Sequence, residues 1–433
     1  MNVTDRLRRL TKEKNPALIS DKEEKIADLR RRIETILERR RSTAVAEKNE
    51  PRAEPLALML ATEGEEIENT FGRVFVAHGR LEAASFHGRR RIRELPAINM
   101  PAVAILAKDS RLTGLKPEDA LFLDTETTGL AGGTGTLAFL IGLGWYQDES
   151  FVTRQIFLRD FTEEPAGLLH LLHLAADKKW LVTFNGKAFD LGLLTTRYVL
   201  NRLDAPFLHL PHLDLLHPSR RILRHRLENS RLVTVEQEVL GLRREGDIPG
   251  EEIPERYFEW LRYRDARLMK DVLEHNRLDV VSMATLTIHL ADLVGHGLDA
   301  EDFHHGDLLA VARLQIEHGN PELAENLLTD LIHPTNGPVA VEAARLLSLI
   351  YKRTDRHPQA VDLWEQILQF DAYDFFAIEE LAKWYEHHQK DYAAALDLVR
   401  RCLFQAPNLN QKQKEDLQYR LFRLEHRAER TRR

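Results

Sequence analysis

The sequence predicts an α/β domain, with a mixed sheet flanked by helices, followed by an all-α region of helical repeats. Short apolar runs of strand length alternate with helical patterns between residues 115 and 297. An apolar pattern recurs every 34 residues in the C-terminal third. The chain of 433 residues is also longer than one typical domain, so two or three domains are expected.

The composition is that of a soluble globular protein, with 43% hydrophobic and 30% charged residues. The chain lacks the ~18 to 20 uninterrupted apolar residues that cross a bilayer, and residues 1–15 lack the apolar core of a secretory signal. We therefore expect a cytoplasmic protein that does not bind membranes. Cys402 is the only cysteine, which excludes an internal disulfide and a cysteine zinc cluster. With a net charge of −7, the protein would need local basic patches or metal ions to bind a polyanion.

Residues 1–55 are predicted to form a charged helix and a linker. Ile26, Leu29 and Ile33 recur at helical spacing among many charges. This pattern fits either a helix that docks on a partner or a solvated helix with a thin apolar stripe.

Residues 56–114 form a second N-terminal region, whose fold the sequence leaves uncertain. Its run RVFVAHGRLEAASFHG suggests a pair of strands around His78–Gly79.

The predicted α/β domain spans residues 115–297 and has a definite order of elements. Strands are expected at 121–124, 136–147, 151–160 and 178–186, helices at 163–177 and 188–203, an extended segment at 207–216, and helices from there to residue 294. Three consecutive strands, then a helix, a strand and further helices is the order of a ribonuclease-H-like fold.

The C-terminal region is expected to contain tetratricopeptide-like repeats at residues 305–410, followed by a charged tail at 411–433. Adding 34 takes Leu347 to Leu381, and three further apolar positions agree in the same register. A chance alignment of helical periodicities is the alternative. Residues 340–399 contain eleven acids and six bases, a balance that favours a protein partner over direct contact with nucleic acid.

A pair of acids follows the first predicted strand, in the stretch LFLDTETTG. Side chains alternate along a strand, so Asp124 and Glu126 share a face while Thr125 points to the other. Two adjacent carboxylates repel each other, and burial raises the pKa of an acid. Mg²⁺ or Mn²⁺ removes this conflict because these hard cations prefer carboxylate oxygens. The pair therefore predicts a metal platform at the end of a strand.

Three further residues complete a candidate catalytic set. Asp190 follows the strand KWLVTFNG at the start of a helix, and His275 and Asp279 share one face of a later helix. The acids Asp124, Glu126, Asp190 and Asp279 suit the binding of two divalent cations, Mg²⁺ or Mn²⁺, for phosphodiester hydrolysis. His275 is the candidate general base, because its ordinary pKa of about 6.5 lets it take a proton from water near neutral pH.

Three motifs in this region, DTETTG, FNGKAFD and HNRLD, resemble those of the DEDD superfamily of 3′-to-5′ exonucleases in order and separation. Over residues 115–405, the sequences DTETTGLAGGTGT, RLENSRLVTVEQEVLGLRREGDIPGEEIP and HNRLDVVS, followed by helical repeats, look like the bacterial YprB-type RNase-H-like proteins. The resemblance implies a metal-dependent exonuclease that acts on DNA or RNA, with a single-stranded 3′ end as the expected substrate. His275 departs from the family pattern. It precedes Asp279 by four residues, as in the tyrosine-bearing branch, whereas the histidine branch has a gap of five, and one residue turns a helical side chain by about 100°.

The glycine-rich stretch AGGTGT after the first motif is predicted to be a tight turn. A Walker loop would end in Gly-Lys-Ser/Thr, and the stretch contains no lysine. The resemblance implies that Thr127, Thr128 and Gly129 contact the terminal nucleotide, and that Asn185 also binds substrate, as in proofreading domains of family-B polymerases. The glycines Gly132, Gly133 and Gly135 fit either a close approach of the nucleotide or a purely structural turn.

Two arginine clusters are candidate substrate contacts. Arg220, Arg221 and Arg224, with Arg226 nearby, would guide phosphates toward the acids, although a solvated helix face fits them equally. Arg89–Arg93 form a second candidate patch. In FLHLPHLDLLHP, His212 and Asp214 would share one strand face but His209 and His217 would not, so we do not expect a dedicated metal site there.

The sequence therefore predicts a DEDD-type 3′–5′ exonuclease with a protein-binding repeat region. A nucleic-acid-binding adaptor with a degraded, non-catalytic site is the alternative. The presence of all four acids argues against the adaptor, whereas the spacing of His275 argues for it.

Overall fold

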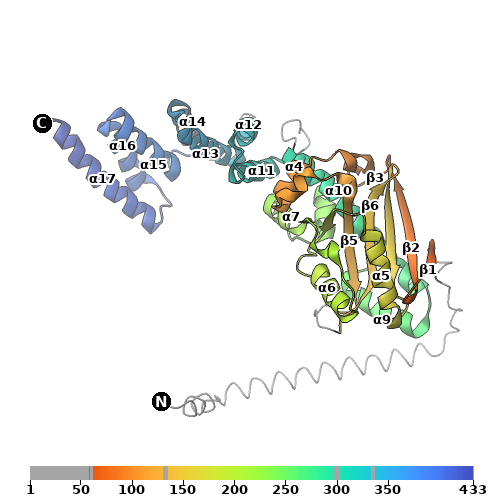
Figure 1. The fold of residues 1–433 in the computed structure, drawn as a ribbon. Coiled ribbons are helices and arrows are strands. Elements are labelled where there is room, and N and C mark those ends of the chain that lie inside the picture. The colour runs from red at the N-terminus through yellow and green to blue at the C-terminus, as the bar shows by residue number, and fades with distance from the viewer. Residues whose placement is uncertain (1–57, 59–61, 130–134, 296–302, 333–336, 433) are drawn as a thin grey trace, which may run out of the picture. The chain divides into compact units, whose positions relative to one another are not determined.

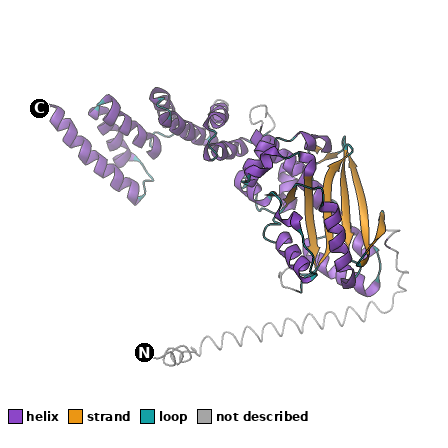
Figure 2. Ribbon diagram, in the orientation of Figure 1, coloured by secondary structure: helices purple, strands orange, loops and turns teal. Residues whose placement is uncertain are grey.

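The computed structural model describes residues 58, 62–129, 135–295, 303–332 and 337–432. The predicted N-terminal helix and linker at 1–55 therefore lie outside the described residues, as do Gly132 and Gly133. Helices flank a seven-stranded mixed sheet, and the C-terminal region is all-helical (Figure 2). The predicted fold class is confirmed.

The sheet has the strand order β1-β2-β7-β6-β5-β8-β9 (Figure 1). Its strands are β1 (Gly64–Asn69), β2 (Gly72–Glu82), β5 (Ala120–Thr127), β6 (Ala138–Gln147), β7 (Ser150–Phe157), β8 (Trp180–Thr183) and β9 (His212–Asp214). A two-stranded ribbon consists of β3 (Phe86–His87) and β4 (Arg90–Arg91). Neighbours from β1 to β5 pair antiparallel, whereas β5, β8 and β9 run parallel. The carboxyl ends of these three parallel strands thus meet at one edge of the sheet, which is where open α/β sheets place their ligands.

Helices cover both faces of the sheet. The helices of this domain are α4 (Met100–Ala107), α5 (Glu164–Ala175), α6 (Asp190–Leu200), α7 (Leu216–Leu223), α8 (Leu232–Val235, continued by a π segment at Glu236–Leu240), α9 (Ile253–Tyr263) and α10 (Arg267–Gly295). Leu121 and Leu123 of β5 share a core with α5, α6 and α9. Phe122 faces the opposite way and shares a core with α4, α7 and the C-terminal half of α10. Both faces of β5 are therefore covered, which explains why its first four residues are all apolar.

Helix α10 is long and apolar enough to cross a membrane by composition alone. In the protein, 72% of its apolar window is buried. Core helices of soluble proteins pass the same test, so the length and apolarity of α10 fit its place against the sheet.

The segment at 56–114 supplies two strands of the sheet, β1 and β2. The predicted break at His78–Gly79 is wrong, because β2 runs through both residues and pairs with β7 along its length. Gly79 serves packing rather than a turn, since an added Cβ would lie 2.3 Å from Oγ1 of Thr153. The expected extended segment at 207–216 contains a 3₁₀ turn, Pro206–His209, before the short strand β9.

The C-terminal region is a series of helices in which each contacts the next. They are α11 (His305–Glu317), α12 (Pro321–Ile332), α13 (Pro338–Arg353), α14 (His357–Phe370), α15 (Phe375–Trp384, continued by a π segment at Tyr385–Gln389), α16 (Tyr392–Gln405) and α17 (Gln411–Arg432). Leu347 and Leu381, which are 34 positions apart, are both buried, on α13 and α15. The expected charged tail is the helix α17, which buries Leu417 and Leu424. The tetratricopeptide assignment itself stays a prediction.

The buried side-chain amide of Asn276 fixes the position of α10 on the sheet. Asp124, Gly142 and Gln155 are neighbours across β5, β6 and β7, and Asn276 of α10 lies over this row. Nε2 of Gln155 donates hydrogen bonds to Oδ1 of Asn276 at 2.8 Å and to the carbonyl oxygen of Leu273 at 2.7 Å. Asn276 is fully buried, and a glycine at position 142 leaves the space that its side chain occupies.

Gly142→Ala is expected to destabilise the fold, because the new Cβ would lie 2.2 Å from Oδ1 of Asn276. Overpacking of this kind typically costs about 1 to 3 kcal/mol of the free energy of unfolding. Urea denaturation measures the effect. Gly192→Ala is the matched control, because nothing lies within 4 Å of its added Cβ on α6. Equal losses in the two variants would contradict the close packing at Gly142.

Candidate functional site

The acid pair of β5 lies at the strand's carboxyl end, where burial gives way to partial exposure. Asp124 points to the α10 face, and its Oδ2 accepts a hydrogen bond of 2.8 Å from Nδ2 of Asn276. Thr125 points to the α6 face, where its hydroxyl donates to Oδ1 of Asp190. The alternation of side chains on one strand thus joins β5 to two helices on opposite faces of the sheet.

Asp190, the first residue of α6, is positioned by the loop 184–189. Asp214 at the end of β9 is buried and holds this loop. Its carboxylate accepts backbone N–H bonds from Asn185 at 2.7 Å, Lys187 at 3.0 Å and Leu216 at 3.1 Å. Asn185 adopts φ of 70°, a left-handed conformation that asparagine tolerates in tight turns. Its backbone conformation and N–H therefore help to place Asp190 beside β5.

His275 and Asp279 lie on one face of α10, as their spacing predicts. Nε2 of His275 is 3.8 Å from Oδ2 of Asp279. On the other side of the ring, Nδ1 of His275 lies 2.8 Å from Oδ1 of Asp247. Asp247 thus holds the imidazole by one nitrogen and leaves the other directed toward Asp279.

Arg244 is a buried cation of the site, and sequence reasoning missed it. Its side chain is only 3% exposed. Its guanidinium donates to Asp279, to Glu236 with Nε–Oε2 at 2.8 Å, and to Asp247 with Nη1–Oδ2 at 3.0 Å. Burial opposes its charge, but Asp279 and Glu236 outweigh that effect and raise the pKa of Arg244 above its ordinary range. Arg244 therefore stays charged and neutralises part of the acidic cluster.

The four candidate ligand acids repel one another. Burial, followed by the charges of Asp279 and Asp190, raises the pKa of Asp124 well above its ordinary range. Burial and then Asp124, Asp279 and Asp190 do the same to the pKa of Glu126. Burial raises the pKa of Asp190 to about 6, against the opposing hydrogen bond from Thr125. Each of these shifts has a neighbouring carboxylate among its causes.

Such a donor set fits divalent cations. Asp124, Glu126, Asp190 and Asp279 offer carboxylate oxygens, the ligands that Mg²⁺ and Mn²⁺ prefer, in a place where negative charge is in excess. A bound cation would lower the pKa of each acid and remove the repulsion between them. The chemistry of these four side chains therefore suits a divalent cation.

The predicted nucleotide-binding residues of the first motif form hydrogen bonds among themselves and with Leu137. The hydroxyl of Thr127 donates to the carbonyl oxygen of Gly129 at 3.0 Å. The Thr128 hydroxyl accepts from the N–H of Leu137 at 3.0 Å, and the N–H of Thr128 donates to the carbonyl of Leu137. These bonds join the end of the first motif to Leu137 at the start of β6. An added Cβ at Gly135 would meet nothing within 4 Å.

The predicted arginine patch divides into two parts. Arg221 pairs with Glu317, and Arg226 pairs with Asp307 through Nη2–Oδ2 at 2.7 Å. Both acids lie on α11, so these two arginines join α7 and the turn after it to the helical region. Arg220 and Arg224 are exposed on the surface.

The second patch is also partly engaged. Arg90 pairs with Asp292 at 2.6 Å and with Glu94 at 3.2 Å, and Arg91 lies over the ring of Phe86. These contacts are within the domain, which supports a structural role for them.

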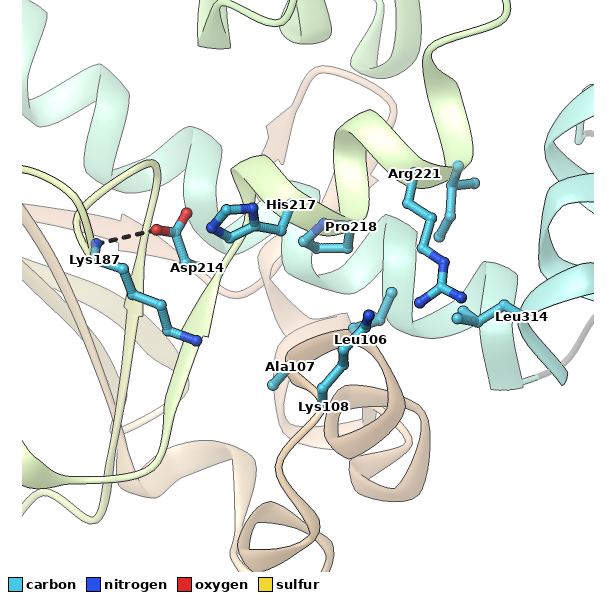
Figure 3. Close-up of a pocket in the computed structure, with 10 residues that line it drawn as sticks. Leu106, Ala107, Lys108, Lys187, Asp214, His217, Pro218, Arg221 and Leu314 are labelled. Atoms are coloured by element: carbon cyan, nitrogen blue, oxygen red, sulfur yellow. Dashed lines mark hydrogen bonds between the residues drawn. The ribbon is translucent and has the colours of Figure 1, made fainter. Parts of the chain in front are cut away.

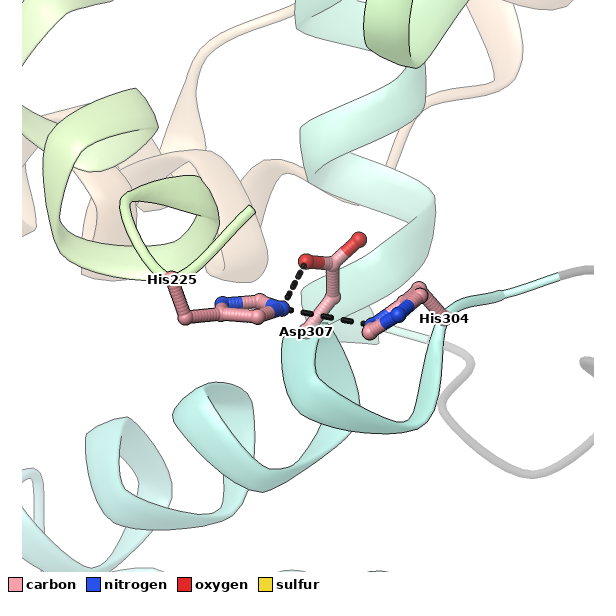
Figure 4. Close-up of side chains that lie close together, drawn as sticks. All are labelled: His225, His304 and Asp307. Carbon is pink, nitrogen blue, oxygen red and sulfur yellow. Dashed lines mark hydrogen bonds and ion pairs between the residues drawn. The ribbon is translucent and has the colours of Figure 1, made fainter. Parts of the chain in front are cut away.

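A second cluster with metal-ligand chemistry lies at the start of α11 (Figure 4). Nε2 of His225 is 3.2 Å from Nδ1 of His304 and 3.4 Å from Oδ1 of Asp307. However, Arg226 donates to both oxygens of Asp307, and the N–H of Gly306 donates to Nδ1 of His304. A guanidinium and a helix N-terminus both disfavour a further cation here. The contacts instead describe a hydrogen-bonded joint between α11 and the turn after α7.

Several residues at the acid site were not identified from the sequence. Asn276 was within reach, since it lies inside the motif HNRLD beside His275. Arg244 and Asp247 lie in the stretch RREGD, whose spacing gives no sign that it folds against α10. Phe189, which precedes Asp190, is 62% exposed, and that exposure is visible only in the fold.

Comparisons with known proteins agree with the fold. A family model described as the RNase H superfamily matches residues 121–291. The uncharacterized protein YprB of Bacillus subtilis (strain 168) is 36% identical over 315 residues, which cover 72% of this chain and 75% of that protein.

The repulsion among the acids predicts a metal-dependent stability. An acid whose pKa is raised by folding binds protons more tightly in the folded state, so its ionisation lowers the free energy of unfolding as pH rises. Without divalent cations, Asp124→Asn is therefore expected to be more stable than the wild type at pH 8, by on the order of 1 to 3 kcal/mol, and the difference should shrink toward pH 4. Millimolar Mg²⁺ should stabilise the wild type more than the variant.

Urea unfolding at a series of pH values, with EDTA or Mg²⁺, measures this difference. The buried His87 and His212 have lowered pKa values, which make stability rise with pH. This contribution is the same in both proteins, so it cancels when their free energies of unfolding are compared. Glu118→Gln, at the amino end of β5, is the control and should follow the wild type. Equal stabilisation of wild type and Asp124→Asn by Mg²⁺ would contradict a cation at Asp124.

Proposed function

The chain belongs to the YprB family and carries an RNase H superfamily domain, and on this premise we propose that it is a metal-dependent 3′–5′ exonuclease of the DEDD type. RNase-H-like domains of this class suggest nuclease activity and nucleic-acid binding. The observation that carries the proposal is the mutual repulsion of Asp124, Glu126 and Asp190, together with Asp279, at the edge where the parallel strands end. Such a pocket is electrostatically tolerable when cations fill it.

The proposed site residues have distinct roles. Asp124, Glu126, Asp190 and Asp279 would hold two Mg²⁺ or Mn²⁺ ions. When bound, the metals supply an activated water and charge stabilisation for the departing oxygen of a phosphodiester.

His275 is the proposed general base. Its Nδ1 bond to Asp247 sets the orientation of the ring and favours a proton on that nitrogen, so that Nε2 is left to accept a proton on the side of Asp279. In this arrangement Asp247 is a positioning residue. The contact compensates for the unusual spacing of four residues between His275 and Asp279, because the aim of the ring depends on its partner as well as on its place in the helix.

A nucleic-acid-binding adaptor without catalytic activity is the second candidate. The ion pair between Arg244 and Asp279 favours it, because a guanidinium that keeps this carboxylate occupied would compete with a metal. One measurable difference between the two candidates is whether cations displace Arg244 from Asp279.

The helical region is the proposed binding site for a protein partner. Residues 340–399 carry eleven acids and six bases, which is unfavourable for contact with phosphates. Part of this charge is paired internally, for example Glu386 with Arg423 at 2.6 Å and with Arg427 at 3.0 Å.

The nuclease proposal predicts that purified protein with Mn²⁺ or Mg²⁺ releases nucleotides from the 3′ ends of DNA or RNA. Asp124→Ala is expected to lower the rate by at least about 100-fold, because removal of even an outer partner of a metal ligand costs 10- to 100-fold. Time courses with single- and double-stranded substrates, each end blocked in turn, measure activity and polarity. Glu118→Ala is the control and should retain full activity.

Two results would contradict this assignment in different ways. Equal cleavage by wild type and Asp124→Ala would remove these acids from the active site. A wild type that binds nucleic-acid ends but degrades none of them with either metal would leave the adaptor as the function.

A further inference from the structure

A cleft with a cationic lining opens between the end of α4 and α7 (Figure 3). Its volume is about 430 Å³, and its polar lining consists of Lys108, Lys187, His217, Arg221 and Asp214. These residues come from the end of α4, the loop 184–189, β9 and α7, while Leu314 of α11 contributes an apolar side chain. The cleft is of the size that holds small ligands, about 300 to 1,000 Å³.

The cleft lies next to the acids through one short loop. Lys187 precedes Asp190 by three residues, and its N–H donates to Oδ2 of Asp214 at 3.0 Å. Asp214 closes β9, one of the three parallel strands whose carboxyl ends form this edge. The cleft and the acids therefore lie at the same edge of the sheet.

The charge of the cleft suits an anion. Lys108 and Lys187 are exposed, and in the described part of the chain no hydrogen bond or ion pair involves either ammonium group. The acid in the lining, Asp214, has its oxygens satisfied by three backbone N–H groups. The pKa of Asp109 is lowered mainly by Arg111 and to a smaller extent by Lys187, and the Asp109 carboxylate is already paired with Arg111 at 2.7 Å. Two lysines are thus available for a ligand.

We propose that this cleft binds the phosphodiester backbone of a single nucleic-acid strand whose end lies at the acids. Lys187 and Lys108 contact successive phosphates, and His217 extends the polar wall toward Arg221, which Glu317 neutralises. A volume of about 430 Å³ is comparable with the size of about one nucleotide. The inference rests on the proposed nuclease function and specifies its substrate as a single strand several nucleotides long.

The double substitution Lys108→Gln/Lys187→Gln tests this cleft. Both residues are exposed, and Gln leaves the side-chain length and backbone demands nearly unchanged, including the left-handed φ of 55° at Lys108. The matched control is Lys179→Gln, an exposed lysine just before the amino end of β8, at the opposite edge of the sheet.

Binding is measured by fluorescence anisotropy of labelled 12-nucleotide DNA and RNA strands, with EDTA and in the Asp124→Asn background so that the strand stays intact. The double variant is expected to bind about 5- to 30-fold more weakly. The slope of log affinity against log salt should fall by about 1.4, since each phosphate contact on a single strand contributes about 0.7. Lys179→Gln should match the parent. Equal affinity and slope in all three proteins would overturn the proposal, as would the absence of strand binding by the parent.

Cleavage separates this inference from the proposed function. With Mn²⁺ and otherwise wild-type protein, the double variant should raise KM for a 12-nucleotide strand about 10-fold. It should leave hydrolysis of the p-nitrophenyl ester of thymidine 5′-monophosphate, a single-nucleotide substrate, unchanged. Loss of both activities alike would show that the lysines act on the acid site, and would overturn the proposal that the cleft binds the strand.

Two further outcomes remain distinct. If the wild type cuts neither substrate but the double variant still loses strand binding, the nuclease proposal fails and the cleft stands. If the double variant loses inhibition by thymidine 5′-monophosphate but binds strands as the parent does, the cleft holds a released nucleotide, and the proposal of a strand path is overturned.

Discussion

The electrostatic repulsion among carboxylates at the end of β5 is the constraint on which the site depends. The pKa values of Asp124 and Glu126 are raised by desolvation and by the charges of Asp279 and Asp190. Repulsion of this kind would drive the segments apart unless other contacts hold them. Asn276 ties α10 to Asp124, and the hydroxyl of Thr125 ties α6 to β5. The fold therefore maintains a cluster of negative charge that a divalent cation would relieve.

Arg244 neutralises part of this negative charge. It meets three carboxylates, those of Glu236, Asp247 and Asp279, and is almost completely buried among them. Removing one partner from a buried, paired charge is strongly destabilising, so Arg244 also fixes the segment between α8 and α9 against α10. The same contacts orient His275 through Asp247. Charge neutralisation and the aim of the imidazole are thus two consequences of one network.

Much of the fold and the acid set followed from local patterns. Alternation along β5 predicted that Asp124 and Glu126 share a face, and helical spacing predicted the same for His275 and Asp279; the structure places each pair accordingly. The remaining features depend on contacts between distant segments. No sequence periodicity indicates that Arg244 pairs with Asp279 or that Arg221 pairs with Glu317, since these partners lie on separate elements. The sequence indicated strands around His78–Gly79 but not that β2 runs unbroken through them, because Gly79 marks a close approach to Thr153 and not a turn.

Anomalous diffraction from crystals of the full chain grown with Mn²⁺ tests the central claim most directly. The account predicts manganese peaks within about 2.5 Å of carboxylate oxygens of Asp124, Glu126, Asp190 and Asp279, with Asp279 released from Arg244. Crystals in millimolar Mn²⁺ that show no peak among these acids, and that retain the pair between Arg244 and Asp279, would contradict it.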